Sequence, residues 1–177
     1  MPNILVTRLY IALTTLPDAS KLLRLFMPLL GLIILLLIIG FKSRFLEIHL
    51  LKSSRKEIIK IVITSFFTPA LAEEIVFRIL FLPHPVETPL ITTQILWGTI
   101  SLAAFIIYHP LQGLTWNQVG YNVFTNPSFL ILSAILGAMC TIAYLVVGSI
   151  WPSVIIHWLA VVIWIVLLDG FAKFPNI

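Results

Sequence analysis

The chain has 177 residues, of which 60% are apolar and only 10% are charged. Soluble domains are typically about 45–50% apolar and about 25% charged, so this sequence has too little charge to cover the surface of a soluble protein. The composition excludes a soluble enzyme, a disordered chain and a DNA-binding domain. It predicts an all-α, polytopic integral membrane bundle of about five helices, which forms a single membrane domain over residues 1–177.

The positive charge gathers in one segment. The formal net charge is +4, and between residues 42 and 60 six basic residues stand against two acidic ones, Glu47 and Glu57. Such a basic loop beside an apolar segment typically faces the cytoplasm and lies near anionic lipid. The excess charge therefore predicts a loop that faces the cytoplasm, or the stroma if the membrane is a thylakoid, and nucleic acid is not expected as a partner.

The first half of the chain contains two apolar runs. Residues 1–24 are expected to form an interfacial segment, because their apolar stretch is interrupted by Arg8 and no signal-peptide cleavage site follows. The run 25–41 is just long enough to cross a bilayer. The run 58–82 is apolar at both ends, and Pro69 is expected to bend it.

The second half is free of charge from Thr88 to Leu168. Within it, the runs 129–147 and 150–168 are long enough to span a membrane, whereas 95–108 is too short to do so alone. We expect this short run to begin near residue 95 and to form a half-spanning helix. The stretch 110–127 is polar but uncharged, so we expect it to be partly embedded and covered by protein, since irregular backbone is not tolerated against lipid.

Small residues recur every four positions in the run 129–147, at Ser133, Gly137 and Thr141. Small side chains at this spacing allow membrane helices to approach closely. The lone cysteine, Cys140, lies in the same run and is expected to be a buried, inert thiol.

Three ionisable residues, Glu73, Glu74 and Arg78, lie inside the run 58–82. Each charge at the centre of a membrane helix costs roughly 2.5–3.5 kcal/mol. Glu74 and Arg78 are four residues apart and can pair on one helix face, whereas Glu73 is rotated by about 100°. Glu73 is therefore the candidate general base. The alternative is a buried ion triad that only fixes helix packing.

Two histidines, His109 and His157, stand in the uncharged half. Together with the glutamates they suggest water activation, in which a glutamate takes the proton and the histidines polarise a carbonyl or hold an oxyanion. Two histidines and a glutamate could also bind zinc. Because the H-E-x-x-H signature is absent and the groups lie on three helices, neither a metal nor another cofactor is favoured. His49 and His84 are expected at the surface.

Three motifs occur in a fixed order: E-E-x-x-x-R at Glu73 to Arg78, F-x-x-x-H at Phe105 to His109, and His157 on the last helix. In this order, in a helical membrane chain, they resemble the CAAX-protease and bacteriocin-processing (CPBP or Abi) family of intramembrane endopeptidases. The resemblance covers a family core of roughly residues 58–168. It is similar to the short cyanobacterial and plastid forms, for which no prenylated CAAX substrate is obvious.

The resemblance implies a role for each motif residue. Glu73 would activate water, Glu74 and Arg78 would support the site, and His109 and His157 would be the motif histidines. The third motif often continues to an asparagine that stabilises the oxyanion, but Val161 occupies that position here. Asn117 or Asn122 could supply the missing donor, or His157 could act alone.

The sequence thus predicts an intramembrane endopeptidase that cleaves membrane-associated or peptide substrates, with membrane lipid and a peptide or protein as partners. The expected location is the plasma membrane or a thylakoid or plastid membrane. A catalytically inactive family member that acts as a membrane scaffold or binding protein is the main alternative, and Val161 favours it. A proton or ion pathway ranks last, because the uncharged half offers few titratable groups to continue it.

Overall fold

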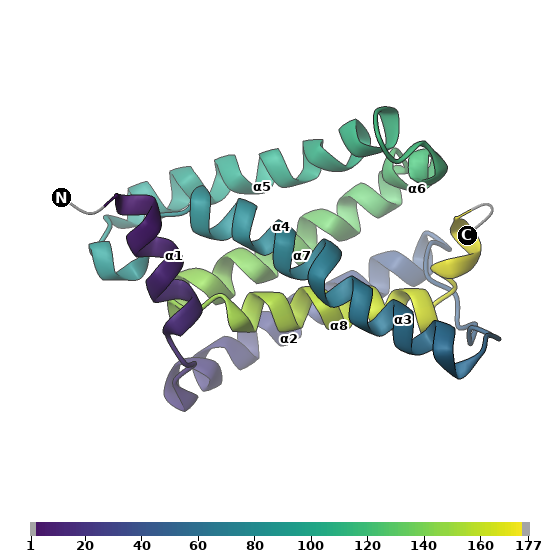
Figure 1. Cartoon of the computed structure of the whole chain (residues 1–177), viewed down its shortest axis with the longest axis horizontal. Coiled ribbons are helices and arrows are strands. Elements are labelled where there is room, and N and C mark those ends of the chain that lie inside the picture. The colour runs from purple at the N-terminus through teal and green to yellow at the C-terminus, as the bar shows by residue number, and fades with distance from the viewer. Residues whose placement is uncertain (1–2, 175–177) are drawn as a thin grey trace.

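The computed structural model describes residues 3–174, and every regular element in that range is a helix (Figure 1). The all-α prediction is confirmed. The six longer helices are α1 (Ile4–Thr14), α2 (Ala19–Lys42), α3 (Arg55–Ser65), α5 (Ile91–Leu114), α7 (Pro127–Val147) and α8 (Trp151–Leu167). The short elements are η1 (Phe66–Leu71), α4 (Ala72–Glu74), η2 (Ile75–Leu80), η3 (Pro85–Glu87), η4 (Gln118–Gly120), α6 (Tyr121–Phe124) and η5 (Phe171–Lys173).

Three helices among the described residues, α2, α5 and α7, are long and apolar enough to cross a membrane. Helix α8 is equally apolar but has only 17 residues. On α2, large apolar side chains point outward, and Phe26 and Met27 are 58% and 73% exposed. An apolar helix with an exposed apolar surface is suited to contact with lipid.

The second apolar run forms one long, kinked helix that is divided into α3, η1, α4 and η2 (Figure 1). It begins at a capping box in which Ser54 and Glu57 satisfy each other's backbone N–H groups. Thr68 has extended backbone angles (φ −139°, ψ 112°) directly before Pro69, because a residue that precedes proline is pushed out of the helical region. The kink expected at Pro69 is therefore present, four residues before Glu73.

Helix α5 is longer than the sequence indicated. It runs without interruption for 24 residues, from Ile91 to Leu114, and contains Pro110. The expectation of a short, half-spanning helix that begins near residue 95 was wrong. The apolar run is shorter than the helix because the helix also accommodates polar side chains. The Gln94 amide, just before the run, donates to the Pro89 carbonyl, and the Thr99 hydroxyl within the run donates to the Ile95 carbonyl. The polar stretch after α5 packs back on the bundle, and Val123 and Phe124 are buried in it.

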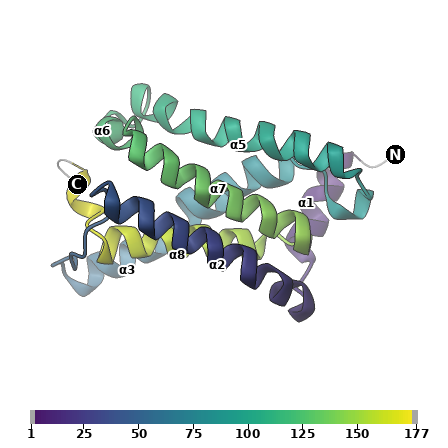
Figure 2. The same cartoon turned by 180° about the vertical axis from the view of Figure 1, so that it is seen from behind.

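Helices α5 and α7 cross at close range (Figure 2). The predicted small residues Ser133 and Thr141 are buried, and Gly137 faces α5. A Cβ atom placed on Gly137 would lie 2.8 Å from Leu102 Cδ1 and 2.9 Å from Phe105 Cδ1. The absence of a side chain at residue 137 therefore sets the distance between the two helices.

We expect Gly137→Ala to lower the free energy of unfolding by about 1–3 kcal/mol, because the added methyl group overpacks this contact. Gly31→Ala on α2 is the matched control, since no atom lies within 4 Å of its added Cβ. Thermal unfolding of both variants in detergent measures the difference. Equal melting temperatures would show that the α5–α7 contact relaxes freely.

Helix α1 is held at one end of the bundle by an ion pair. Arg8 Nε and Nη2 donate to the two carboxylate oxygens of Glu87 at 2.6 and 2.8 Å. His84 lies beside this pair and is only 3% exposed, so its predicted surface position was wrong. Its ring is used on both sides: Nδ1 accepts from the Val86 N–H, and Nε2 bonds the Gly148 carbonyl at 2.8 Å.

The hydrogen bond from Arg8 holds the pKa of Glu87 below its ordinary value. A carboxyl group with a lowered pKa in the folded state stabilises the fold above its unfolded pKa of about 4.3, and this contribution disappears as the pH falls through the lowered folded pKa. Because the pair is partly exposed, we expect no more than about 1 kcal/mol. Thermal melts below about pH 4.3 should therefore fall less steeply for Glu87→Gln than for wild type, and parallel curves would contradict this.

Candidate active site

The five predicted site residues come from four elements of the bundle. Glu73 and Glu74 lie on α4, Arg78 on η2, His109 on α5 and His157 on α8. All five are buried. The kinked helix supplies the acids and the arginine, and the two later helices supply one histidine each, so residues far apart in the sequence meet inside the bundle.

Glu74 joins the kinked helix to α8. Its Oε2 atom lies 3.0 Å from Arg78 Nε, which is the pairing expected from their spacing of four residues. Its Oε1 atom lies 2.9 Å from His157 Nδ1. Because a carboxylate can only accept, Nδ1 of His157 donates to it, and Nε2 is left as the nitrogen available to a substrate.

Arg78 is fully buried, and its remaining donors are used within the bundle. Nη1 donates to the Ser101 hydroxyl and Nη2 to the Gly137 carbonyl, both at 3.2 Å. The guanidinium carbon also lies 5.3 Å from the centre of the Phe105 ring. Sequence reasoning missed Ser101, because a single small polar residue in an apolar helix carries no signal of its own.

Among the described residues, Glu73 differs from Glu74 in having an oxygen with no cation within hydrogen-bond distance. Glu74 Oε2 also lacks a hydrogen bond with normal geometry within residues 3–174, but it lies 3.0 Å from Arg78 Nε. The Oε2 atom of Glu73 is buried, and no hydrogen-bond partner is present among the described residues. The nearest charged contact is His157 Nε2 at 3.8 Å, which exceeds hydrogen-bond length. A buried carboxylate oxygen without a partner is costly, so this atom is available to bind water or substrate.

The orientation of the His109 ring is fixed by a hydrogen bond within its own helix. Its Nδ1 atom donates to the Phe105 carbonyl at 2.8 Å, which leaves Nε2 unused. The imidazole packs edge-on against Phe105 and Phe129, with ring centres 4.8 and 5.2 Å away. These contacts set the tautomer and the direction of the ring.

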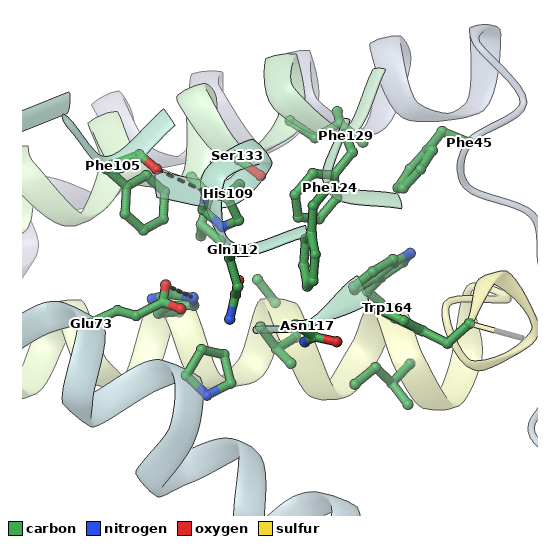
Figure 3. A pocket seen from close by; sticks show the side chains of 18 of the residues that line it. Phe45, Glu73, Phe105, His109, Gln112, Asn117, Phe124, Phe129, Ser133 and Trp164 are labelled. Carbon is green, nitrogen blue, oxygen red and sulfur yellow. Dashed lines mark hydrogen bonds and ion pairs between the residues drawn. The ribbon is translucent and has the colours of Figure 1, made fainter. Parts of the chain in front are cut away.

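One cavity of about 430 Å³ connects the site residues (Figure 3). Glu73, His109 and His157 line it, whereas Glu74 and Arg78 lie behind its wall. Its other lining residues are mostly aromatic and aliphatic, with a few polar groups that include Gln112, Asn117 and Ser133. An apolar cavity with a few convergent polar groups is the usual form of a ligand site.

The two candidates for the missing oxyanion donor are separated by the fold. Asn117 lines the cavity, and so does Val161, the residue at the motif's asparagine position. Asn122 lines instead a second, smaller pocket. Gln112, one turn after His109, is a cavity residue that the sequence reasoning overlooked, although its spacing of three residues from the histidine could have indicated it.

The family described as type II CAAX prenyl endopeptidase Rce1-like matches residues 55–163, which is more than half of the chain. The chain belongs to this family. The resemblance drawn from the three motifs is thereby confirmed, and membership supports an intramembrane protease that acts on peptide or protein substrates. Neither the curated proteins nor the solved structures gave a match to the chain.

A metal could be considered at one point in this Rce1-like chain. Ligand atoms of Glu74, Cys140 and His157 lie within 4.8 Å of one another, and all three residues are buried. The sequence analysis had considered two histidines and a glutamate, but the third group here is the cysteine thiol. Arg78 occupies Glu74 Oε2 at 3.0 Å, so a divalent cation at this point would lie next to a fixed positive charge. The donor set therefore fits a metal poorly.

Proposed function

We propose that this Rce1-like chain is an intramembrane endopeptidase in which Glu73 activates a water molecule. The observation that carries the proposal is the free, buried Oε2 atom of Glu73 on the wall of a cavity that also contains His109 and His157. A general base needs a carboxylate with an unused lone pair within reach of water. Glu74 is less suited, because its Oε1 accepts from His157 Nδ1 and its Oε2 lies 3.0 Å from the Arg78 cation, which lowers its basicity.

In the proposed reaction, a water molecule bound in the cavity attacks the peptide carbonyl carbon while Glu73 takes its proton. The carbonyl oxygen becomes an oxyanion. When the tetrahedral intermediate collapses, the carbon–nitrogen bond breaks and the leaving amine receives the proton from Glu73. One water molecule is consumed, and the products are a carboxylic acid and an amine, between which the remaining water proton moves to give a carboxylate and an ammonium group.

His157 is the group best suited to stabilise the oxyanion. Its Nδ1–H is bound by the Glu74 carboxylate at 2.9 Å, an arrangement that stabilises an imidazolium, so Nε2–H can donate toward the cavity. With both glutamates ionised, Glu73, Glu74 and Arg78 together carry one negative charge. A protonated His157 balances it, and a buried cluster without net charge is favoured.

His109 is suited to hold the water. With Nδ1–H bound to Phe105, its neutral form has an acceptor at Nε2. Such an acceptor can receive the second hydrogen of the attacking water and orient its lone pair. His109 would then be a positioning group for the nucleophile, whereas His157 acts on the carbonyl.

The proposed reaction needs no metal. Arg78 beside Glu74 supports this, because the position that a cation would take is already positively charged. We expect activity to survive prolonged dialysis against a strong chelator, and activity restored only by zinc would contradict the proposal. The assay uses purified protein in detergent with a panel of membrane peptides that includes a prenylated peptide ending in a CAAX sequence.

Val161 provides a test of whether the site is catalytically complete. Its side chain lines the cavity one turn after His157, so Val161→Asn would add an amide donor to the same wall. If an oxyanion donor is missing, the substitution should raise peptide turnover by about 10²–10³-fold. Burial of the amide could lower stability by about 1–3 kcal/mol, so turnover is compared at temperatures equally far below each melting point.

The alternative is an inactive family member that binds other membrane proteins, and Val161 is the observation that favours it. In that case neither wild type nor Val161→Asn would cleave any peptide of the panel. Measurable wild-type turnover with no gain in the variant would instead assign the donor role to another group. Asn117→Leu removes the amide of Asn117 from the cavity wall. If Asn117 is that donor, this substitution should lower turnover.

A further inference from the structure

A second pocket lies at the end of the bundle that carries the basic loop. Its volume is about 280 Å³, and six of its eight lining residues have polar or charged side chains. They are Ser43, Arg44, Asn122, Asn126, Ser128 and Lys173. Two are cations and none is a carboxylate, so the pocket is suited to an anion with several acceptor oxygens.

Arg44, one of the two cations, has a left-handed backbone conformation. It follows Ser43, the C-cap of α2, and has a φ of 55°, a left-handed conformation in which glycine is the common residue at this position. No ion pair of its guanidinium is present among residues 3–174. Arg44 is exposed, so its guanidinium is accessible to an anion in the pocket.

The other side of the pocket also favours an anion. Lys173 Nζ lies 3.5 Å from Asp169 and 5.4 Å from the centre of the Phe45 ring, so its charge is only partly balanced. Asn126 and Ser128 belong to the start of α7, where Asn126 Oδ1 accepts from the Ser128 N–H. The positive end of that helix dipole therefore adds to the two cations.

The position of the pocket at the end of the apolar helix α2 favours a membrane lipid as the source of the anion. Ser43 and Arg44 directly follow Lys42, the last residue of the 24-residue span α2. Trp116 and Tyr121, on the segment that contributes Asn122 to the pocket wall, are 64% and 44% exposed, and exposed Trp and Tyr typically mark the interface between membrane and water. Lipid phosphate groups lie at this level.

We propose that this pocket binds the phosphate of an anionic phospholipid headgroup. Arg44 and Lys173 would contact the phosphate oxygens, and the hydroxyl and amide groups of the remaining lining residues would complete the hydrogen bonds. A headgroup with a quaternary ammonium would be disfavoured, because the pocket offers no carboxylate to pair with it. The proposal is independent of catalysis, since none of the five active-site residues lines this pocket.

The test is a lipid titration of purified protein in detergent, with binding read from the thermal shift and from retained lipid in native mass spectrometry. Phosphatidylglycerol should stabilise the wild type more than phosphatidylcholine does. Each basic residue near an anionic lipid contributes on the order of fivefold in affinity, so the double variant Arg44→Gln with Lys173→Gln should bind about thirtyfold more weakly. The matched control, Lys52→Gln with Lys56→Gln in the same basic segment, should keep the response to lipid in detergent, because neither residue lines the pocket.

The single variant Arg44→Gln guards against a folding defect, because it removes no ion pair within residues 3–174. It should weaken binding about fivefold. Equal responses to phosphatidylglycerol in wild type and the double variant, or none in wild type, would overturn the proposal. So would an equal shift with inorganic phosphate, which would assign the pocket to a soluble anion. An increased KM for the peptide, with an unchanged lipid response, would assign it to the substrate.

Discussion

Glu73→Gln is expected to lower kcat for peptide cleavage by about 10²–10⁴-fold while the protein remains folded. The amide keeps the shape of the side chain but cannot accept a proton from water. Because Glu73 Oε2 has no hydrogen-bond partner in the described part of the chain, the substitution breaks no hydrogen bond at that atom. Turnover under saturating peptide, together with a thermal melt, measures the two effects separately.

Glu47→Gln is the control for this change, since Glu47 is an exposed glutamate of the loop after α2 and its substitution should leave turnover unchanged. Glu74→Gln should behave differently from both. It removes the negative charge and replaces one of the two oxygens that contact Arg78 and His157 with an NH2 donor, so it should lower the melting temperature as well as kcat. Wild-type turnover by Glu73→Gln would remove Glu73 from the chemistry.

Arg78→Ala is expected to lower the free energy of unfolding by about 3–5 kcal/mol, because it leaves the carboxylate of Glu74 buried without its cation. The guanidinium also holds the Ser101 hydroxyl and the Gly137 carbonyl, so the loss extends to α5 and α7. Thermal or denaturant unfolding in detergent measures the change.

Arg78→Lys separates charge from geometry in the same experiment. Lysine keeps the positive charge but lacks the planar fork that reaches several acceptors, so we expect an intermediate melting temperature. A smaller loss of stability for Arg78→Ala than for Glu73→Gln would show that the arginine does not neutralise Glu74 in the folded protein.

Local spacing was sufficient to predict one part of the site. Glu74 and Arg78 are one helical turn apart, and their pairing at 3.0 Å follows from helix geometry alone. The same geometry separated Glu73 from the arginine. Apolar runs similarly predicted the helices that became α2 and α7, because a stretch without charge has few alternatives to a membrane helix.

Other contacts could not be predicted, because they depend on how the helices pack. Glu74 and His157 are 83 residues apart in the sequence, and no spacing rule relates them. The apolar run 95–108 predicted too short a helix, because helix α5 also accommodates Pro110 and Gln112, which a hydrophobicity pattern excludes. His84 was misplaced for a related reason: neighbouring prolines suggested a surface turn, but the turn packs against Gly148 and buries the ring.

The most direct test of water activation by Glu73 is a single turnover of a cleaved membrane peptide in oxygen-18-labelled water, with and without hydroxylamine. With the wild type, we expect one labelled oxygen in each new carboxyl terminus and no hydroxamate product. With Glu73→Gln, we expect no labelled product at a measurable rate. A hydroxamate would reveal a covalent acyl-enzyme intermediate and contradict direct attack by water. Labelled product formed by Glu73→Gln at the wild-type rate would contradict the role of Glu73.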